Sequence, residues 1–408
     1  MKKKILIVLV LFLLFSSTSI ADGLMKQIRV ALPRVTFFFD EMKDLEHLSG
    51  TFFNGKTEVP LAFNYEGTTY VPLRYIGEKL GKEVGYDPNT QSIWVGKRPA
   101  ELSTPSKNIP AQKEGVYGIH IGQSAQEVTA ILGNPNRKEF SRLKYEWWIY
   151  NRDLERYVQV GVMNGKVVDL YSNAPTWEYQ GVKVGSEKSV VEGLQPQNTV
   201  TFPYDGATFT IENNSNERRL LVQNGVATIL YLDLHNRNRV TAIRQLSLET
   251  LVRSQLFTMK YSYYTKAPEI SPPTLSAQEQ EAVDRGNERI IFDLVNVVRA
   301  RFGLSTLSWN EKAAEVARGH SVDMWQHHFF AHVSATTGLS PADRIEQAAI
   351  SYRMTGENIA KGYHDAVEAH EGWMNSEGHR RNILEKEFTT LGVGVKEDLY
   401  TQEFVTPR

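Results

Sequence analysis

The sequence predicts an α+β protein built from several domains. With 408 residues, the chain is long enough for two or three separate hydrophobic cores. Polar stretches that contain prolines, at 99–114 and 261–280, are typical of interdomain linkers. Strand-like runs and helix-like spacing occur together in each part between them. We therefore expect domains at 22–98, 115–260 and 281–408.

The first 21 residues are typical of a secretory signal peptide. Met1-Lys-Lys-Lys4 forms a basic head, an apolar run extends from Ile5 to Phe15, and Ser19-x-Ala21 fits a cleavage site. The apolar run is short for a transmembrane helix, so cleavage after Ala21 is favoured, with an uncleaved anchor as the alternative. The predicted location is extracellular and possibly wall-associated, with no membrane span in the mature chain.

The amino-acid composition argues against two classes of binding partner. The formal net charge is -1 with 23% charged residues, so no excess charge points to nucleic acid or to an anionic membrane surface. The chain has no cysteine, which excludes disulfides and a lipoprotein attachment site. The exported protein must therefore be held together by packing alone.

The pattern of strand-like and helix-like residues in segment 22–98 predicts a small α+β module. Strand-like residues run from Val30 to Phe39, and Asn54-Gly55 is a hairpin turn signal. A strand beginning at Tyr70 continues into a short amphipathic helix, and a last hairpin spans Val84 to Val95 with its turn near Asp87. The expected buried face of the helix consists of Leu73, Ile76 and Leu80.

This module resembles the N-terminal stalk domain of copper amine oxidases, which recurs in exported Gram-positive proteins. The resemblance rests on Thr69-Tyr-Val-Pro-Leu-Arg74 and on the helix-Gly-Tyr-Asp pattern that follows. His47 is the only histidine in the segment, so no copper-ligand cluster accompanies the resemblance. It implies a spacer or adhesion module.

The middle part contains an imperfect internal repeat. Gly118-Ile-His-Ile-Gly122 precedes one amphipathic segment, and Gly181-Val-Lys-Val-Gly185 precedes another. Strand-like runs follow each of them, so we expect two helix-plus-sheet units packed as one α+β domain. The expected strands are Tyr145 to Tyr150, Tyr157 to Val162 and Val167 to Tyr171 in the first unit, and Thr199 to Phe202, Ala207 to Glu212, Ala227 to Asp233 and Val240 to Leu246 in the second.

Leu132-Gly-Asn-Pro135 and the aromatic block Tyr145-Glu-Trp-Trp-Ile-Tyr150 resemble the CAP-associated domain found just upstream of bacterial CAP domains. Trp147 and Trp148 could form a ligand platform, but aromatic residues in a half-buried strand more often pack the core. His120 and His235 are isolated in the sequence, and no nucleophile-base pair suggests catalysis here.

The last third predicts four helices, one short helix and two strands. Apolar residues from Ile290 to Phe302 recur at helical spacing, and Asn310 is a good N-cap for the second helix. Ser340-Pro341 opens the third helix and Asp365 the fourth, while Gly356 permits a tight backbone approach. The remaining predicted elements are a short helix capped by Ser376 and strands at Thr390 to Val395 and Tyr400 to Val405.

Seven short motifs in this region resemble the CAP superfamily of cysteine-rich secretory, venom antigen and plant pathogenesis-related proteins. The resemblance implies a C-terminal α-β-α sandwich with a central cleft, and it is more informative about fold than about function. The matching motifs are Leu307-Ser-Trp-Asn310, Phe330-Ala-His332, Gly356-Glu-Asn-Ile-Ala360, Trp373-Met-Asn-Ser376, Gly378-His-Arg380, Leu391-Gly-Val-Gly394 and Tyr400-Thr-Gln402.

The resemblance also implies the residues of the cleft. His332 matches the first family histidine, Glu357 the first acid and His379 the second histidine. Ser376 stands where eukaryotic members carry a second acid, so a complete tetrad is in doubt. His320 shares a helix face with buried alanines, which favours a hydrogen-bonded core histidine over a ligand.

Two imidazoles and a carboxylate would suit a divalent cation such as zinc, with His332 and His379 as metal ligands and Glu357 as ligand or catalytic base. The alternative is that His332, Glu357 and His379 only form a hydrogen-bonded network. The favoured function is non-enzymatic binding of a cell-wall component, a small ligand or a protein partner. A metal-assisted hydrolase acting on envelope polymer or peptide is the competing hypothesis.

Overall fold

The computed structural model describes residues 30–33, 35–39, 42–43, 50–53, 58–87, 92–97, 116–263 and 266–408. The predicted signal peptide, His47, the Asn54-Gly55 turn and the linker at 99–114 lie outside the described residues. The chain divides into two compact units, Met1–Pro110 and Ala111–Arg408. Each unit is described by itself.

The first unit consists of short antiparallel strand pairs and one helix, α1 (Leu73–Lys79). The predicted final hairpin is confirmed, because β7 pairs with β8 in antiparallel register. The pairs are β1 (Phe38–Phe39) with β2 (Met42–Lys43), β3 (Thr51–Phe53) with β4 (Glu58–Pro60), β5 (Phe63–Tyr65) with β6 (Thr68–Tyr70), and β7 (Val84–Asp87) with β8 (Ser92–Val95).

The predicted buried face of α1 is wrong for Leu73 and Leu80, whereas Ile76 packs against the core as expected. Leu73 and Leu80 are 43% and 54% exposed, whereas Tyr75 is only 1% exposed. The Tyr75 ring packs edge-on against Phe37 and Phe39. Because the helix has only two turns, one large aromatic contact outweighs the leucine stripe in deciding which side is buried.

The middle part of the second unit is built on a seven-stranded antiparallel sheet. The strand order is β17-β18-β19-β12-β11-β10-β9. Helices α3 (Ala125–Leu132) and α4 (Lys188–Gly193) bury Val128 and Val191 in a core on one of its faces. The strands are β9 (Arg137–Phe140), β10 (Glu146–Tyr150), β11 (Val158–Met163), β12 (Lys166–Ser172), β17 (Arg218–Gln223), β18 (Val226–Asp233) and β19 (Arg239–Ser247).

The internal repeat is visible in one backbone hydrogen bond near the start of each of its two copies. Gly122 N donates to Val167 O at 2.8 Å, and Gly185 N donates to Val240 O at 2.7 Å. The acceptors lie near the starts of β12 and β19, which are neighbours at the centre of the sheet. Both glycines have φ near +90° (86° and 92°), a region that side-chain-bearing residues avoid. The two copies of the repeat therefore meet at the central strand pair of β12 and β19.

One part of the second repeat differs from the prediction. The strands expected at 199–202 and 207–212 exist as β15 (Thr199–Tyr204) and β16 (Ala207–Glu212), but they form a separate sheet. Their partner there is β20 (Met259–Tyr263), a strand not anticipated from the sequence. In the large sheet, the unanticipated β17 occupies the position beside β18.

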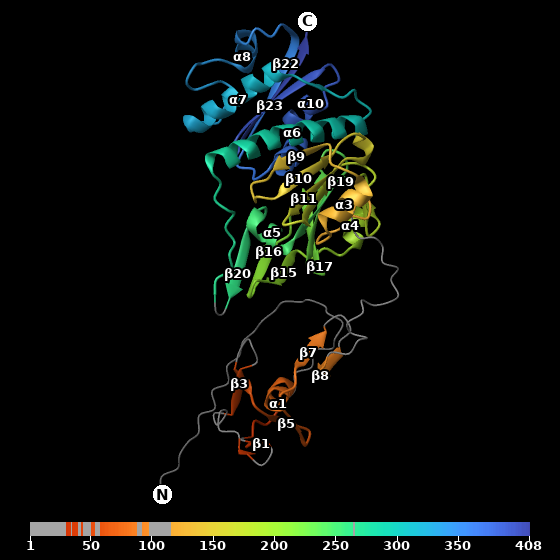
Figure 1. Ribbon diagram of the computed structural model, residues 1–408, viewed down its shortest axis with the longest axis vertical. Coiled ribbons are helices and arrows are strands. Elements are labelled where there is room, and N and C mark those ends of the chain that lie inside the picture. The colour runs from red at the N-terminus through yellow and green to blue at the C-terminus, as the bar shows by residue number, and fades with distance from the viewer. Residues whose placement is uncertain are drawn as a thin grey trace. The chain divides into compact units, whose positions relative to one another are not determined.

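The C-terminal third is the predicted three-layer sandwich. Its sheet has the order β21-β23-β24-β22. Helix α7 packs on one face, and α6 lies on the other, between this sheet and the middle sheet (Figure 1). The elements are α6 (Ala277–Arg301), β21 (Ser308–Trp309), α7 (Glu311–Gln326), α8 (Pro341–Gln347), β22 (Tyr352–Lys361), α9 (Ala366–Met374), α10 (Glu377–Ile383), β23 (Thr390–Lys396) and β24 (Leu399–Pro407).

Two glycines let α7 approach its sheet closely. A Cβ atom on Gly392 would lie 2.1 Å from the Ala314 nitrogen, and one on Gly394 would lie 2.0 Å from the Arg318 nitrogen. The expected tight approach at Gly356 is also present, since a Cβ there would lie 2.9 Å from the Phe388 ring. Backbone contact of this kind requires glycine.

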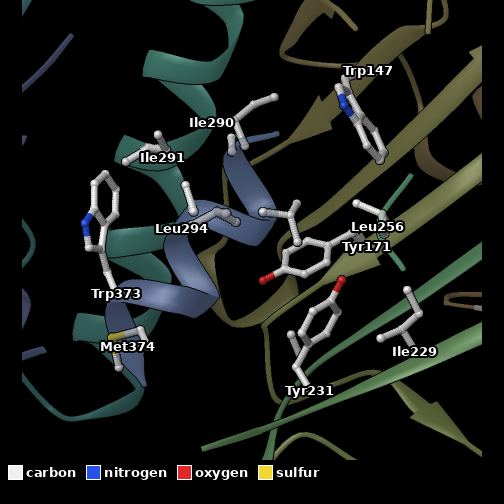
Figure 2. Packing of buried hydrophobic residues seen from close by; sticks show 14 of the residues in the cluster. Trp147, Tyr171, Ile229, Tyr231, Leu256, Ile290, Ile291, Leu294, Trp373 and Met374 are labelled. Carbon is white, nitrogen blue, oxygen red and sulfur yellow. The ribbon is translucent and has the colours of Figure 1, made fainter. Parts of the chain in front are cut away.

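The middle and C-terminal parts share one continuous hydrophobic core. Tyr171 and Ile229 of the large sheet belong to the same buried cluster as Leu294 of α6 and Trp373 of α9 (Figure 2). Trp147, one of the residues considered for a ligand platform, is 3% exposed and belongs to this cluster. The described residues between 116 and 408 therefore form a single packed body. No helix in the described ranges is long and apolar enough to cross a membrane.

Candidate functional site

Glu357 is the centre of the candidate cleft. It lies on β22, the edge strand of the C-terminal sheet, and is 7% exposed. His332 Nδ1 lies 2.7 Å from Glu357 Oε1, and the Arg344 guanidinium donates to Oε2. Burial alone would raise the pKa of Glu357, but the His332 hydrogen bond and the Arg344 charge lower it below its usual value. Glu357 is therefore a buried carboxylate with both oxygens bonded.

Arg344 connects the loop that carries His332 to the sheet. Its Nη1 donates to the backbone oxygens of His332 and Leu339, at 2.9 and 3.0 Å, while Nη2 reaches Glu357. Helix α8, which carries Arg344, starts as predicted, with a capping box between Ser340 and Asp343. Arg344 was not anticipated from the sequence, because no local motif marks it.

A second buried acid, Glu403, was also not anticipated. It stands opposite Glu357 in the β22–β24 register and is 0% exposed. Burial, and then the neighbouring Glu357 charge, raise the pKa of Glu403 well above its usual range. A charged residue type inside an otherwise uncharged strand was the available signal.

His320 is the core histidine that the sequence predicted. It is 1% exposed, and its Nε2 lies 2.9 Å from the Ala331 carbonyl oxygen, so Nε2 carries the hydrogen. Burial lowers the pKa of His320, which keeps the ring neutral. His320 Nε2 also lies 4.0 Å from Glu357 Oε2, so this ring forms the back of the cleft.

His379 approaches from the other side of the edge strand. Asn358, next to Glu357, donates to the His379 backbone oxygen at 3.0 Å, and Asn382 donates to Asn358 Oδ1 at 2.8 Å. The side chain of His379 is partly buried. Burial, and then the charge of His332, lower the pKa of His379, so the two imidazoles lie within electrostatic range.

Ser376 is the N-cap of α10 but makes no side-chain capping bond. Two nearby acids and a neighbouring histidine have partners elsewhere. Glu377 pairs with Arg381, and Glu371 accepts a hydrogen bond from Tyr171 of the middle sheet. His327 Nδ1 lies 2.9 Å from Asp323 Oδ1 rather than near Glu357. The structure thus brings His332 and Glu357 into direct contact but supplies no second acid from these positions.

The pair His332–Glu357 is arranged so that one ring nitrogen remains available. The hydrogen bond to Glu357 occupies Nδ1, and the His332 side chain is 50% exposed. That bond, the largest influence, raises the pKa of His332 above its usual value. A carboxylate behind a histidine is the usual support for a metal-ligating imidazole. Among the described residues, no group of three or more His, Asp or Glu is placed to hold a metal ion.

A groove of about 520 Å³ adjoins the cleft between α7 and α8. His320 and Arg344 form part of its wall, together with Ser334 and Thr336. His320 Nδ1 and Arg344 Nε are buried there without a hydrogen-bond partner among the described residues. Unpaired buried polar atoms are costly, and both of these belong to residues that line the groove.

Three family models match successive parts of the chain. The copper amine oxidase N-terminal domain matches residues 52–117, the CAP-associated N-terminal domain matches 121–257, and the cysteine-rich secretory protein family matches 292–406. All three correspond to the resemblances inferred from the motifs. The predicted multidomain α+β class is likewise confirmed.

Two curated proteins of Bacillus subtilis are similar to the chain. The "uncharacterized membrane protein YlbC" is 36% identical over 328 residues, which is 77% of this chain and 93% of that protein. The "uncharacterized protein YkwD" is 39% identical over 143 residues, covering 35% of this chain and 55% of that protein.

Two solved structures share the fold of the second unit. An extracellular protein containing an SCP domain from Bacillus anthracis has a TM-score of 0.66 and 32% identity, covering 74% of this chain and 99% of that one. A cysteine-rich secretory protein from Staphylococcus aureus has a TM-score of 0.59 and 19% identity, covering 71% and 95%. The second likeness concerns the fold alone.

Proposed function

The chain belongs to the cysteine-rich secretory protein (CAP) family, and from this premise we propose that it is an exported envelope protein whose C-terminal cleft binds a ligand or partner without catalysing a reaction. The observation that carries the proposal is the bonding of Glu357. Both of its oxygens are engaged, by His332 and by Arg344. Although burial acts in the opposite direction, these two contacts lower the pKa of Glu357 below its usual value, which makes it a weaker general base.

The same arrangement favours a binding role for the imidazoles. Glu357 orients His332, and the adjoining groove supplies further polar atoms at His320 and Arg344. A divalent cation such as zinc would be held by His332 and His379 and would leave open coordination positions for an oxygen of the ligand. Two protein ligands predict a weaker site than the three or four of typical zinc proteins.

We expect residues 22–408 to bind Zn²⁺ in a calorimetric titration at pH 7.5, and the His332→Ala, His379→Ala double variant to lose that binding. Protonated imidazole cannot ligate a metal. Because the pKa of His332 is raised, affinity should increase by about tenfold per pH unit below that pKa and level off above it.

The matched control is His327→Ala, His328→Ala, which removes two neighbouring histidines of the same loop. His327 is bonded to Asp323 and not to Glu357, so this variant should bind zinc like the parent chain. Equal zinc binding by the parent and the His332, His379 variant would contradict the metal part of the proposal. The bonded network of Glu357 would then remain as a purely structural or ligand-positioning feature.

We also propose that the protein acts outside the membrane after cleavage following Ala21. One similar structure is described as extracellular, whereas one similar protein is named a membrane protein. When the full chain is expressed in a Gram-positive host, we expect mass spectrometry of the exported protein to show Asp22 at the N-terminus. Recovery of an intact Met1 N-terminus from the membrane pellet would instead indicate an uncleaved anchor.

A further inference from the structure

A second cavity, which shares no lining residue with the His332–Glu357 cleft, lies where the middle part meets α9. Its volume is about 380 Å³. One wall comes from β16 to β18 and the segment leading into β20, and the other comes from α9 and Tyr363. The residues important for its chemistry are Tyr231, Phe257, Tyr363, Glu368 and Glu371. The cavity therefore combines aromatic rings with two buried acids.

Glu371, which lines this cavity, has one carboxyl oxygen without a hydrogen-bond partner among the described residues. The residue is 4% exposed, and its Oε1 accepts a hydrogen bond from the Tyr171 hydroxyl at 2.7 Å. Its Oε2 is buried without a hydrogen-bond partner among the described residues. Figure 2 shows Tyr171 and Tyr231 side by side under α9, with their hydroxyl groups between sheet and helix. A buried carboxyl oxygen without a partner is unfavourable, so a ligand that donates a hydrogen bond to it would be stabilised.

The neighbouring acid, Glu368, has a hydrogen-bond partner at each of its two carboxylate oxygens. Glu368 accepts hydrogen bonds from the Tyr231 hydroxyl and from Arg218. The Arg218 guanidinium also stacks on the Phe257 ring, 4.3 Å from its centre. Arg218 therefore already has a carboxylate partner and a ring partner, and Glu371 is the acid left to meet a ligand.

The charge balance of the cavity is negative. Its lining contains four carboxyl groups, since the exposed Glu212 and Glu217 join the two buried acids, against the two cations Arg218 and Lys260. An acidic, partly aromatic cavity is complementary to an organic cation.

The surroundings of Glu371 raise its pKa, and a cation bound beside it would lower that pKa. Burial is the largest influence and raises the pKa of Glu371 to about 8, although Tyr171 and Arg301 act in the opposite direction; Glu368 and Asp233 raise it further. The carboxyl is thus mostly protonated at pH 7. An ammonium group beside it would favour the carboxylate and displace that proton.

The aromatic wall depends on one glycine. A Cβ atom on Gly372 would lie 2.1 Å from the Tyr363 hydroxyl oxygen. Gly372 therefore lets the hydroxyl end of Tyr363 approach α9 closely, next to Glu371. Any larger residue at position 372 would force the Tyr363 ring to move.

We propose that this cavity binds a primary ammonium group on a short alkyl chain, with Glu371 Oε2 accepting from the ammonium and Tyr231, Phe257 and Tyr363 enclosing the chain. The site is separate from the His332–Glu357 cleft and does not depend on the function proposed for it. In the binding step, neutral Glu371 gives its proton to the buffer and becomes the carboxylate partner of the ammonium cation.

The test uses residues 22–408 and 1,5-diaminopentane as the probe, titrated calorimetrically at pH 7 in two buffers with different ionisation enthalpies. We expect saturable binding with release of about 0.9 proton per site, as the pKa of Glu371 near 8 requires. Glu371→Gln keeps the shape and the Tyr171 bond but cannot become an anion. It should lower the affinity at least tenfold and abolish the proton release.

Matched controls distinguish binding in this cavity from binding elsewhere on the protein and from loss of the fold. Glu377→Gln, which changes an exposed acid paired with Arg381, should leave binding unchanged, as should the His332→Ala, His379→Ala variant. Tyr363→Leu should weaken binding by removing one aromatic wall, with an unchanged thermal midpoint showing that the fold is intact. Absence of binding, equal binding by Glu371→Gln, or equally tight binding of 1-pentanol would overturn the proposal.

Discussion

Replacing Arg244 by methionine is expected to lower the free energy of unfolding of residues 111–408 by about 3–5 kcal/mol, the range for breaking one side of a buried ion pair. Arg244 is 1% exposed and contacts Asp169 of β12 at 2.7 Å and Asp365, the N-cap of α9, at 2.8 Å. It thereby joins the middle sheet to the C-terminal sandwich. Without it, the fully buried Asp169 loses its counter-charge, and burial raises the pKa of that carboxyl.

Urea unfolding followed by far-UV circular dichroism measures this effect. The control is Arg239→Met on the same strand, because Arg239 pairs at 2.8 Å with Glu187, whose side chain is 65% exposed. Solvent screening makes such a surface pair worth about 0–1 kcal/mol. Similar losses for the two variants would mean that the buried network contributes no more than a surface pair.

Gly394→Ala is expected to destabilise the same unit by about 3 kcal/mol or more, at or above the upper end of the usual cost of overpacking. The added Cβ would lie 2.0 Å from the backbone nitrogen of Arg318 in α7. Backbone atoms of a packed helix cannot turn aside as a flexible side chain does. The helix must therefore move away from β23, which disturbs the layer that holds His320 in the cleft.

Gly319→Ala is the matched control, because Gly319 lies in α7 beside Arg318 and nothing lies within 4 Å of its ideal Cβ position. Alanine is favoured over glycine inside a helix by about 0.8–1 kcal/mol, so this variant should be more stable than the parent. Thermal unfolding of both variants gives the comparison. Equal midpoints for Gly394→Ala and the parent chain would show that α7 adjusts without cost.

Local features were the most predictable part of the fold. The N-caps Asn310, Ser340 and Asp365 each accept a hydrogen bond from a backbone N–H three residues later, as the sequence indicated. The strand β22 was not predicted, although it carries Glu357. Its burial pattern is irregular, so no two-residue alternation marks it in the sequence.

In the candidate site, too, residues within local motifs were predictable, whereas contacts between distant elements were not. Motifs placed His332, Glu357 and His379 in one cleft, and the structure bonds the first two directly. Arg344 and Glu403 were missed because their roles depend on elements that meet only in three dimensions. Their electrostatic effect on Glu357 could not be inferred from spacing along the chain.

The sequence by itself determined the family, the repeat and the starts of the C-terminal helices, because these depend on short motifs, turn glycines and caps that act within a few residues. Tertiary structure decided that the middle and C-terminal parts share one core, that both Glu357 oxygens are bonded and that Glu371 faces a cavity. The physical reason is that burial and charge pairing are properties of surfaces in contact. Arg244 and Asp365, 121 residues apart, are partners only because the sheet and α9 pack together.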